Sequence, residues 1–435
     1  MSVPNALTVA GSTPLRGRIR VPGDKGISHR ALLFAALADG RSRARGLAGG
    51  DDVWRTRRAL VDMGVAITSV GSAVTVEGRG IDALSEPPTV LDCGNSGTTM
   101  RLTAGLVAGR RFLTVLSGDE SLVTRPMARV VEPLGRMGAH VDGRAGGSRP
   151  PLVIRGAALQ GGAHELTVAS GQVKTALILA GLQADGTTEI VEPVLSRDHS
   201  ERMLGALGAP VTRVDERTVR VTRGAPVPLD LDVPGDPSSA AFWIVGAAIS
   251  PGSDLVVEQV DCNPTRLGFV EVLRRMGARI EVEPTGQQLG EPVGNIHVVA
   301  GPLTATTIGG HEIPRLIDEI PVLAVAAAFA EGVTEIRDAV ELRVKESDRV
   351  ATVCEMLVGL GVGAEPASDG LSIRGGRPRP ARLDSHGDHR IAMAAAIAAN
   401  AADGESIVEG WRAVLTSYPE FTDDLAVLTG RAGAS

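Results

Sequence analysis

The feature that most constrains this chain of 435 residues is an internal repeat, which recurs every 66 to 80 residues or so. Each copy contains an Ala-rich run, a glycine, a short run rich in β-branched residues, a polar loop and an amphipathic segment. The repeated glycines are Gly40, Gly109, Gly186, Gly252, Gly332 and Gly404. Similarity at a regular spacing is the sequence signature of a chain that is built from one repeated supersecondary unit.

A second glycine pattern gives the content of the unit. In five places a Met or Leu precedes Gly-Ala or Gly-Val, and these glycines are Gly64, Gly138, Gly208, Gly277 and Gly361. A glycine that follows a helix takes up the left-handed cap conformation, and the β-branched residues after it predict a strand. Examples are residues 65–69 and 73–78. The unit is therefore predicted as β-α-β-α-β-β, six times over, with the sixth copy cut short at Ser435.

Six such units predict two α/β domains. A solenoid is the alternative, but these units are longer than most solenoid repeats and vary in length. A chain of this length also exceeds one ordinary hydrophobic core. The Pro-rich segment 226–234 predicts one crossing between the domains, and Val21-Pro22 predicts another. We expect one domain at residues 21–230, and a second formed by residues 1–20 together with 231–435.

The composition argues against several classes of function. A net charge of −7 and an aromatic content of 2% argue against nucleic acid as a partner. The three cysteines are far apart without CxxC spacing, so we expect free thiols and neither disulfides nor a zinc site. We see no signal peptide, and the apolar stretches are too short to span a membrane. We therefore expect a cytoplasmic protein without membrane contact.

Basic residues recur where loops open into predicted helices. The repeated positions are Lys25, Arg101, Arg125, Arg349 and Arg390. A single arginine in a first helical turn is most often a solvated surface charge, and it opposes the helix dipole. A set of them in equivalent places is better explained by a bound anion, because helix N-termini offer free N–H groups and partial positive charge. We therefore expect a site for small anions.

Two carboxylates could add acid–base chemistry to this site. Asp318 and Glu346 lie near the basic residues in sequence, although Asp318 could equally cap a helix and Glu346 could form a surface ion pair. His386 and His389 have the spacing of a metal pair, but no cluster of acidic or Cys residues accompanies them, so we expect no metal. Sequence patterns of P-loops, zinc proteases and esterases are absent.

Taken together, the motifs resemble the 5-enolpyruvylshikimate-3-phosphate synthase family, in order from about Pro14 to Leu428. The segments that carry the resemblance are VPGDKGISHRALLFAALADG, LDCGNSGTTMRL, TRPM, ASGQVKTAL, LIDEIPVLAVAAA, LRVKESDR and GDHRIAMA. The resemblance implies two inside-out α/β barrel domains, each of three β-α-β-α-β-β units. It also implies a transferase of the shikimate pathway, which leads to chorismate and the aromatic amino acids. No cofactor is implied, and we expect a monomer.

The resemblance also implies roles for individual residues. The residues implied for shikimate 3-phosphate are Lys25, Arg30, Ser170, Gln172, Arg197, Asp318 and Lys345. Those implied for phosphoenolpyruvate are Lys25, Gly97, Arg125, Gln172, Arg349 and Arg390. Asp318 would take the proton of the 5-hydroxyl, Glu346 would serve proton transfer at C3, and Lys25 would touch both substrates. The first domain would then carry most of the shikimate 3-phosphate site, and the second would carry the catalytic Asp and much of the phosphoenolpyruvate site.

Three positions depart from the family pattern. Gly26 stands where the family usually has a substrate-binding Ser, Gly171 replaces another small residue, and Thr416 stands where one branch has a Lys. Gly26 raises the alternative of a related enzyme with an altered substrate. A second alternative is the enzyme that transfers enolpyruvyl to UDP-N-acetylglucosamine, but its loop Cys is absent here. A third is a non-catalytic anion-binding repeat protein, which would not need Asp318 and Glu346.

Overall fold

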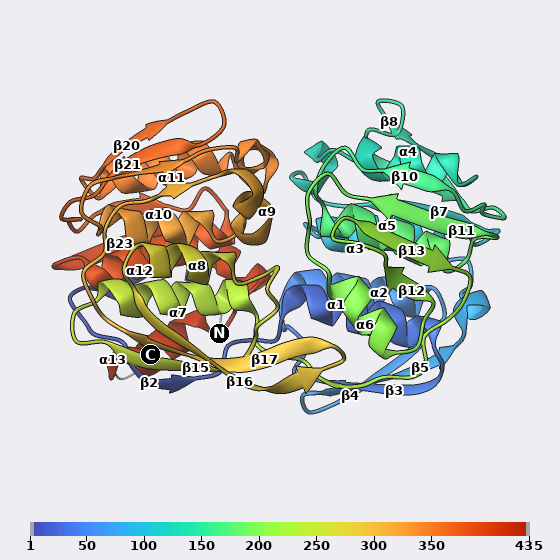
Figure 1. Ribbon diagram of the computed structural model, residues 1–435, viewed down its shortest axis with the longest axis horizontal. Helices are drawn as coiled ribbons and strands as arrows, with labels where there is room; N and C mark the ends of the chain where they lie inside the picture. The colour runs from blue at the N-terminus through green and yellow to red at the C-terminus, as the bar shows by residue number, and fades with distance from the viewer. Residues whose placement is uncertain (1–3, 432–435) are drawn as a thin grey trace. The chain divides into compact units, whose positions relative to one another are not determined.

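The computed structural model describes residues 4–431, and its contacts group the chain into two compact units (Figure 1). The N-terminal unit comprises Gly23–Val233 with the short segment Gln287–Glu291. The C-terminal unit comprises the chain up to Pro22, Pro234–Gly286 and the chain from Pro292 onward. The small segment could not be predicted from the sequence, and its Glu291 Oε1 lies 2.9 Å from His199 Nδ1.

The N-terminal unit contains three sheets of one design. In each sheet the first two strands are parallel and the other pairings are antiparallel. In sheet order, the strands are β14 (Asp230–Asp232), β3 (Asp39–Arg45), β5 (Ala73–Arg79) and β4 (Ala66–Val70); β6 (Leu91–Asp92), β7 (Leu113–Ser117), β9 (Arg149–Arg155) and β8 (His140–Arg144); and β10 (Ala163–Glu165), β11 (Thr187–Val191), β13 (Thr218–Thr222) and β12 (Val211–Arg213).

Two kinds of helix accompany these sheets. The helices α1 (Lys25–Leu37), α3 (Gly97–Val107) and α5 (Gly171–Gly181) are buried on nearly every side. The helices α2 (Asp51–Asp62), α4 (Ala128–Arg136) and α6 (His199–Ala206) bury one face only. A helix that is apolar all round must lie inside the protein. The unit is therefore built inside out, with a helical interior and sheets around it (Figure 1).

The C-terminal unit repeats this design. Its strands, in sheet order, are β2 (Arg16–Ile19), β15 (Asp254–Asp261), β17 (Glu291–Val299) and β16 (Arg279–Gln288); β18 (Thr307–Ile308), β19 (Val333–Ile336), β21 (Leu371–Arg374) and β20 (Gly363–Pro366); and β22 (Arg382–Asp384), β23 (Glu405–Glu409) and β1 (Ala6–Ala10). The interior helices are α7 (Pro237–Ile249), α10 (Ile320–Ala328) and α12 (His389–Ala401). The outer helices are α8 (Gly268–Arg275), α11 (Arg349–Gly359) and α13 (Phe421–Thr429), and α9 (Ile313–Leu316) is one short turn.

Strands that are distant in sequence complete three of the sheets. β14 pairs with β3 in parallel, although the two strands lie at opposite ends of the N-terminal unit's main segment. β2 pairs with β15 in parallel, and β1 pairs with β23 antiparallel, with Ala6 opposite Glu409. The sixth repeat therefore obtains its third strand from the start of the chain. The three cysteines are free, as expected.

Candidate active site

Side-chain caps start the interior helices of the N-terminal unit. Asp24, Ser96 and Ser170 cap α1, α3 and α5, and each accepts a hydrogen bond from the amide three residues on, at 2.7, 3.1 and 3.4 Å. Lys25 and Gly97 are the first residues of α1 and α3. Both therefore lie at the positive end of a buried helix, which favours anions.

The start of α3, at Gly97, is surrounded by four polar residues: Asn95, Arg101, Arg125 and Gln172. Arg101 Nη1 donates to Gln172 Oε1 at 2.5 Å, and Arg125 Nη2 donates to Asn95 Oδ1. A Cβ at Gly97 would lie 3.1 Å from Arg101 Nη1 and 3.4 Å from Arg125 Nη1. Gly97 therefore leaves the space that both guanidinium groups occupy at this helix end. The structure brings Gly97, Arg125 and Gln172 together, and it shows that Arg101, one of the repeated basic positions, orients Gln172 through this hydrogen bond.

Arg30 connects three elements of the same unit. Its Nε donates to Ser200 Oγ at 2.8 Å, its Nη2 to Thr175 Oγ1 at 2.7 Å, and its Nη1 to Gly26 O at 2.9 Å. Arg30 is 4% exposed, and burial lowers its pKa to about 10. The guanidinium group therefore keeps its charge at neutral pH, and the side chain is fixed between α1, α5 and α6.

Arg197 lies in the loop between β11 and α6 and passes close to the start of α5. A Cβ at Gly171 would lie 3.1 Å from Arg197 O and 3.3 Å from Arg197 Cβ. Gly171 is therefore suited to a close approach of this loop, which places Arg197 beside Ser170. Lys25 Nζ, in turn, lies 2.9 Å from Asp52 Oδ2, and both side chains are partly buried.

In the C-terminal unit, one carboxylate lies among three cations. Asp318 Oδ1 is 3.2 Å from Lys345 Nζ and 3.4 Å from Arg349 Nη1. Asp318 Oδ2 is 4.0 Å from Arg390 Nη2, and Arg390 Nη1 donates to Asp318 O at 3.1 Å. Asp318 immediately precedes Glu319, the cap residue of α10, and its side chain is 15% exposed. The alternative that Asp318 merely caps a helix is therefore wrong.

Arg349 connects the carboxylates of this group. It is 1% exposed, and its Nε donates to Asp388 Oδ2 at 2.8 Å and its Nη2 to Glu346 Oε2 at 2.6 Å. Burial alone would lower the pKa of Arg349, but the carboxylates of Asp388, Glu346 and Asp318 outweigh burial and raise it. For Asp388, burial opposes ionisation, yet Arg349 keeps the pKa of this carboxyl below its usual value.

All five residues predicted in this half of the sequence therefore form one cluster: Asp318, Lys345, Glu346, Arg349 and Arg390. Such a cluster can bind an anion through its cations and move a proton through a carboxylate.

The nearby histidines pair with separate carboxylates. His386 Nε2 lies 3.0 Å from Glu355 Oε2, whereas His389 Nδ1 lies 4.0 Å from Asp388 Oδ1.

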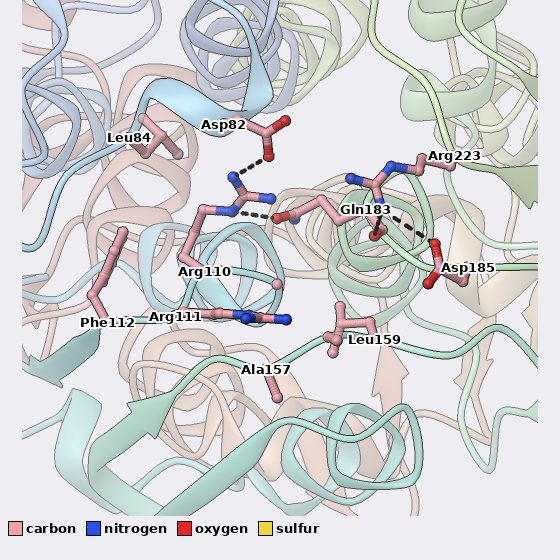
Figure 2. Close-up of a pocket in the computed structure, with 12 residues that line it drawn as sticks. Asp82, Leu84, Arg110, Arg111, Phe112, Ala157, Leu159, Gln183, Asp185 and Arg223 are labelled. Carbon is pink, nitrogen blue, oxygen red and sulfur yellow. Dashed lines mark hydrogen bonds and ion pairs between the residues drawn. The ribbon is translucent and has the colours of Figure 1, made fainter.

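A cavity of about 390 Å³ lies elsewhere in the N-terminal unit, near the C-terminal ends of α3 and α5 (Figure 2). None of the predicted site residues lines it. Helix C-termini carry partial negative charge, and here Gln183 Nε2 donates to the carbonyl groups of Leu106 and Leu179, both at 2.9 Å. Arg110 Nε donates to Gln183 Oε1 at 2.9 Å and Arg110 Nη1 to Asp82 Oδ1 at 2.7 Å. Anionic substrates therefore suit the opposite ends of these helices.

The buried His29 predicts a loss of stability in acid. Its Nδ1 is 2.7 Å from Thr56 Oγ1, while its Nε2 has no hydrogen-bond partner among the described residues. Burial lowers the pKa of His29 to about 3. An unfolded histidine binds a proton below pH 6.5 or so, whereas the folded one stays neutral, so stability falls as the pH falls from about 6.5 to 3. We expect His29 to account for a loss of about 2 kcal/mol at pH 5.

Urea denaturation at pH 7 and pH 5 measures this effect. His29→Gln should make the unfolding free energy less dependent on pH, since the variant has no imidazole to protonate. The exposed His140 provides the control, because His140→Gln should keep the pH dependence of the parent protein. An unchanged pH dependence in His29→Gln would contradict the assignment.

Each of the two α/β units carries cations at helix starts, and in the C-terminal unit a carboxylate lies among them, which suits an enzyme that acts on anionic substrates. The comparisons identify which one. The model of the family EPSP synthase (3-phosphoshikimate 1-carboxyvinyltransferase) matches residues 9–425. The 3-phosphoshikimate 1-carboxyvinyltransferase of Herpetosiphon aurantiacus is 51% identical and covers 95% of this chain and 97% of its own. That of Synechococcus sp. strain WH7803 is 52% identical, with 95% and 96% covered. The chain belongs to the EPSP synthase family.

Solved structures agree on the fold. The EPSP synthase of Acinetobacter baumannii superposes with a TM-score of 0.87 at 39% identity, and it covers 97% of this chain and 98% of its own. The enolpyruvyl transferase NikO of Streptomyces tendae has a TM-score of 0.79 at 20% identity, with 97% of each chain covered, and it supports the fold alone. The predicted family, fold class and enzyme class, a transferase of the shikimate pathway, are confirmed. No helix within residues 4–431 has the length and apolar character needed to cross a membrane.

Proposed function

We propose that this enzyme transfers the enolpyruvyl group of phosphoenolpyruvate to the 5-hydroxyl of shikimate 3-phosphate, and that Asp318, which lies among three cations, accepts the proton of this hydroxyl. The relatives at about 50% identity support the reaction. The observation that carries the residue assignment is the placement of Asp318 between Lys345, Arg349 and Arg390. A pure anion-binding protein would need the cations but not a carboxylate that competes for them.

The chemistry requires three proton transfers and the departure of one leaving group. Asp318 accepts the proton of the 5-hydroxyl as the hydroxyl oxygen bonds to C2 of phosphoenolpyruvate, and C3 gains a proton. The tetrahedral intermediate then loses the C3 proton and the C2–O bond to phosphate, which regenerates the double bond. Glu346 serves proton transfer at C3, and Arg349, 2.6 Å from Glu346 Oε2, holds it in place. Cations that are already in place stabilise the charges that develop.

The substrate-binding roles follow the two groups of residues. Shikimate 3-phosphate is assigned to Lys25, Arg30, Ser170, Gln172, Arg197, Asp318 and Lys345. Phosphoenolpyruvate is assigned to Lys25, Gly97, Arg125, Gln172, Arg349 and Arg390. Both substrates carry several negative charges and repel each other, so the site must supply several cations before they can react. We further propose that the enzyme acts in the cytoplasm as a monomer without a metal.

A phosphate-release assay tests the function. Purified protein with phosphoenolpyruvate and shikimate 3-phosphate should release phosphate and form the enolpyruvyl ether, which mass spectrometry identifies. UDP-N-acetylglucosamine as the acceptor should give no product. Product with UDP-N-acetylglucosamine alone would identify the alternative transferase, and phosphoenolpyruvate binding without any product would identify an anion-binding protein.

Gly26→Ser is expected to lower the KM for shikimate 3-phosphate about fivefold, because the family's usual hydroxyl adds a hydrogen bond worth about 1 kcal/mol. A Cβ at Gly26 would lie 3.1 Å from Asp24 Oδ1, 3.4 Å from Arg30 Nη1 and 3.6 Å from His199 Cδ2, so the fit is close. These neighbours are side-chain atoms, which can adjust. Gly26→Ala is the control, since it adds the Cβ without the hydroxyl. Equal KM values for the Ser and Ala variants would show that the hydroxyl adds nothing here.

A further inference from the structure

Lysine is rare in this protein. Of its 44 basic residues only three are lysines, namely Lys25, Lys174 and Lys345. Arginine therefore fills nearly every position that needs only a positive charge. Lys25 and Lys345 belong to the proposed substrate site. Lys174 does not, and its side chain is entirely buried in the N-terminal unit.

Two buried carboxylates surround Lys174. Its Nζ lies 2.7 Å from Glu192 Oε2 and 2.7 Å from Glu201 Oε1. Glu192 Oε1 accepts a hydrogen bond from Ser196 Oγ, and Glu201 Oε1 lies 2.7 Å from Arg213 Nη2. The two cations balance the two carboxylates. A compact ammonium group can donate in several directions, whereas a guanidinium group is planar and larger. This geometry explains why a lysine occupies the position.

This charge network is connected to several of the proposed shikimate 3-phosphate residues. Lys174 follows Gln172 by two residues on α5, and Ser196 immediately precedes Arg197. The neighbours of the network, Thr175 and Ser200, accept hydrogen bonds from Arg30, at 2.7 and 2.8 Å. The ion pairs of Lys174 thus connect α5 to the loop that carries Arg197 and to the first turn of α6.

We propose that Lys174 is a positioning residue for the shikimate 3-phosphate site, which it maintains by fixing the Arg197 loop through Glu192 and Ser196. This inference rests on the proposed function of that site. Lys174 does not touch the substrate, and its effect passes through Arg197. A purely structural ion pair would change stability and treat both substrates alike. A positioning role changes the KM for shikimate 3-phosphate and leaves the KM for phosphoenolpyruvate nearly unchanged.

Two variants of different severity test the proposal. Ser196→Ala removes only the hydrogen bond to Glu192 and is expected to raise the KM for shikimate 3-phosphate about fivefold. Lys174→Met removes the ammonium group and is expected to raise it at least tenfold, with the KM for phosphoenolpyruvate within twofold of the parent value. Arg220→Gln is the control, because it removes an exposed ion pair, to Glu189 at 2.8 Å, from the same unit. Its KM values should not change.

A double-mutant cycle separates positioning from stability. If Lys174 acts through Glu192 and Ser196, Ser196→Ala should have no further effect on KM in the Lys174→Met background. Additive effects, or equal changes in both KM values, would overturn the proposal. If Lys174→Met does not fold, Ser196→Ala alone decides, and KM values within twofold of the parent would refute the role. A parent protein that releases no phosphate would instead refute the proposed function, and the inference with it.

Discussion

Asp318→Asn is expected to lower kcat about 10³-fold, because the amide cannot accept the proton of the 5-hydroxyl. The substitution keeps the size of the side chain and one oxygen for the donors at 3.2 and 3.4 Å, Lys345 Nζ and Arg349 Nη1. The KM values should therefore change much less than kcat. Steady-state phosphate release with both substrates measures the two parameters separately.

Glu331→Gln is the matched control for Asp318→Asn, since Glu331 is an exposed carboxylate in the same unit. It should leave kcat unchanged. Thermal unfolding of both variants shows whether the fold is retained. A folded Asp318→Asn protein with a kcat within tenfold of the parent value would exclude Asp318 as the base and would assign proton transfer elsewhere in the cluster.

Arg349→Met is expected to lower both stability and activity, and the stability loss should be about 3–5 kcal/mol. Arg349 is 1% exposed and pairs with Asp388, which is fully buried, so its removal leaves a buried carboxylate without its cation. The loss should be largest at neutral pH. Arg349 lowers the pKa of Asp388, so the pair stabilises the folded protein above the unfolded Asp pKa of about 3.9, and this stabilisation disappears as the pH falls through the lower folded pKa.

The double variant Arg349→Met with Asp388→Asn separates the two effects. Asparagine is also a good helix cap, so it can replace Asp388 at the start of α12 without a buried charge. Most of the lost stability should return in urea denaturation. Activity should not return, because Arg349, which is proposed to bind phosphoenolpyruvate, is still missing. The kcat/KM for phosphoenolpyruvate should stay at least about 10²-fold below the parent value. Recovery of activity along with stability would show that Arg349 is only structural.

The local elements could be predicted because their signals are local. The five glycines after a Met or Leu all have positive φ, for example 89° at Gly64 and 108° at Gly138. The predicted runs 65–69 and 73–78 are close to the observed β4 and β5. The number of repeats could likewise be predicted, because each copy carries its own cap and strand signals. The predicted residues Asp318 to Arg390 could be placed in one site because each flanks the start of a helix: α10, α11 or α12.

Pairings between distant residues could not be predicted in this way. Nothing near Lys174 in the sequence indicates that its partners are Glu192 and Glu201, since an ion pair depends on how the elements pack. The same holds for the segment Gln287–Glu291, whose contacts belong to the other half of the chain. Arg101 was visible as a helix-entry cation, but its hydrogen bond to Gln172 needs the packing of α3 beside α5. Sequence therefore predicts the elements and their ends, while packing determines the contacts.

The pairing of β1 with β23 has a consequence for synthesis on the ribosome. Nearly all of the N-terminal unit is one continuous stretch, Gly23–Val233, which can begin to fold while the rest is being translated. The strand β1 is made earlier, yet its partner residues, 405–409, are translated after every other strand of the described residues. Throughout that interval β1 carries an unpaired edge, which is a site for wrong pairing. The nascent chain must therefore leave β1 without its partner until β23 has been made.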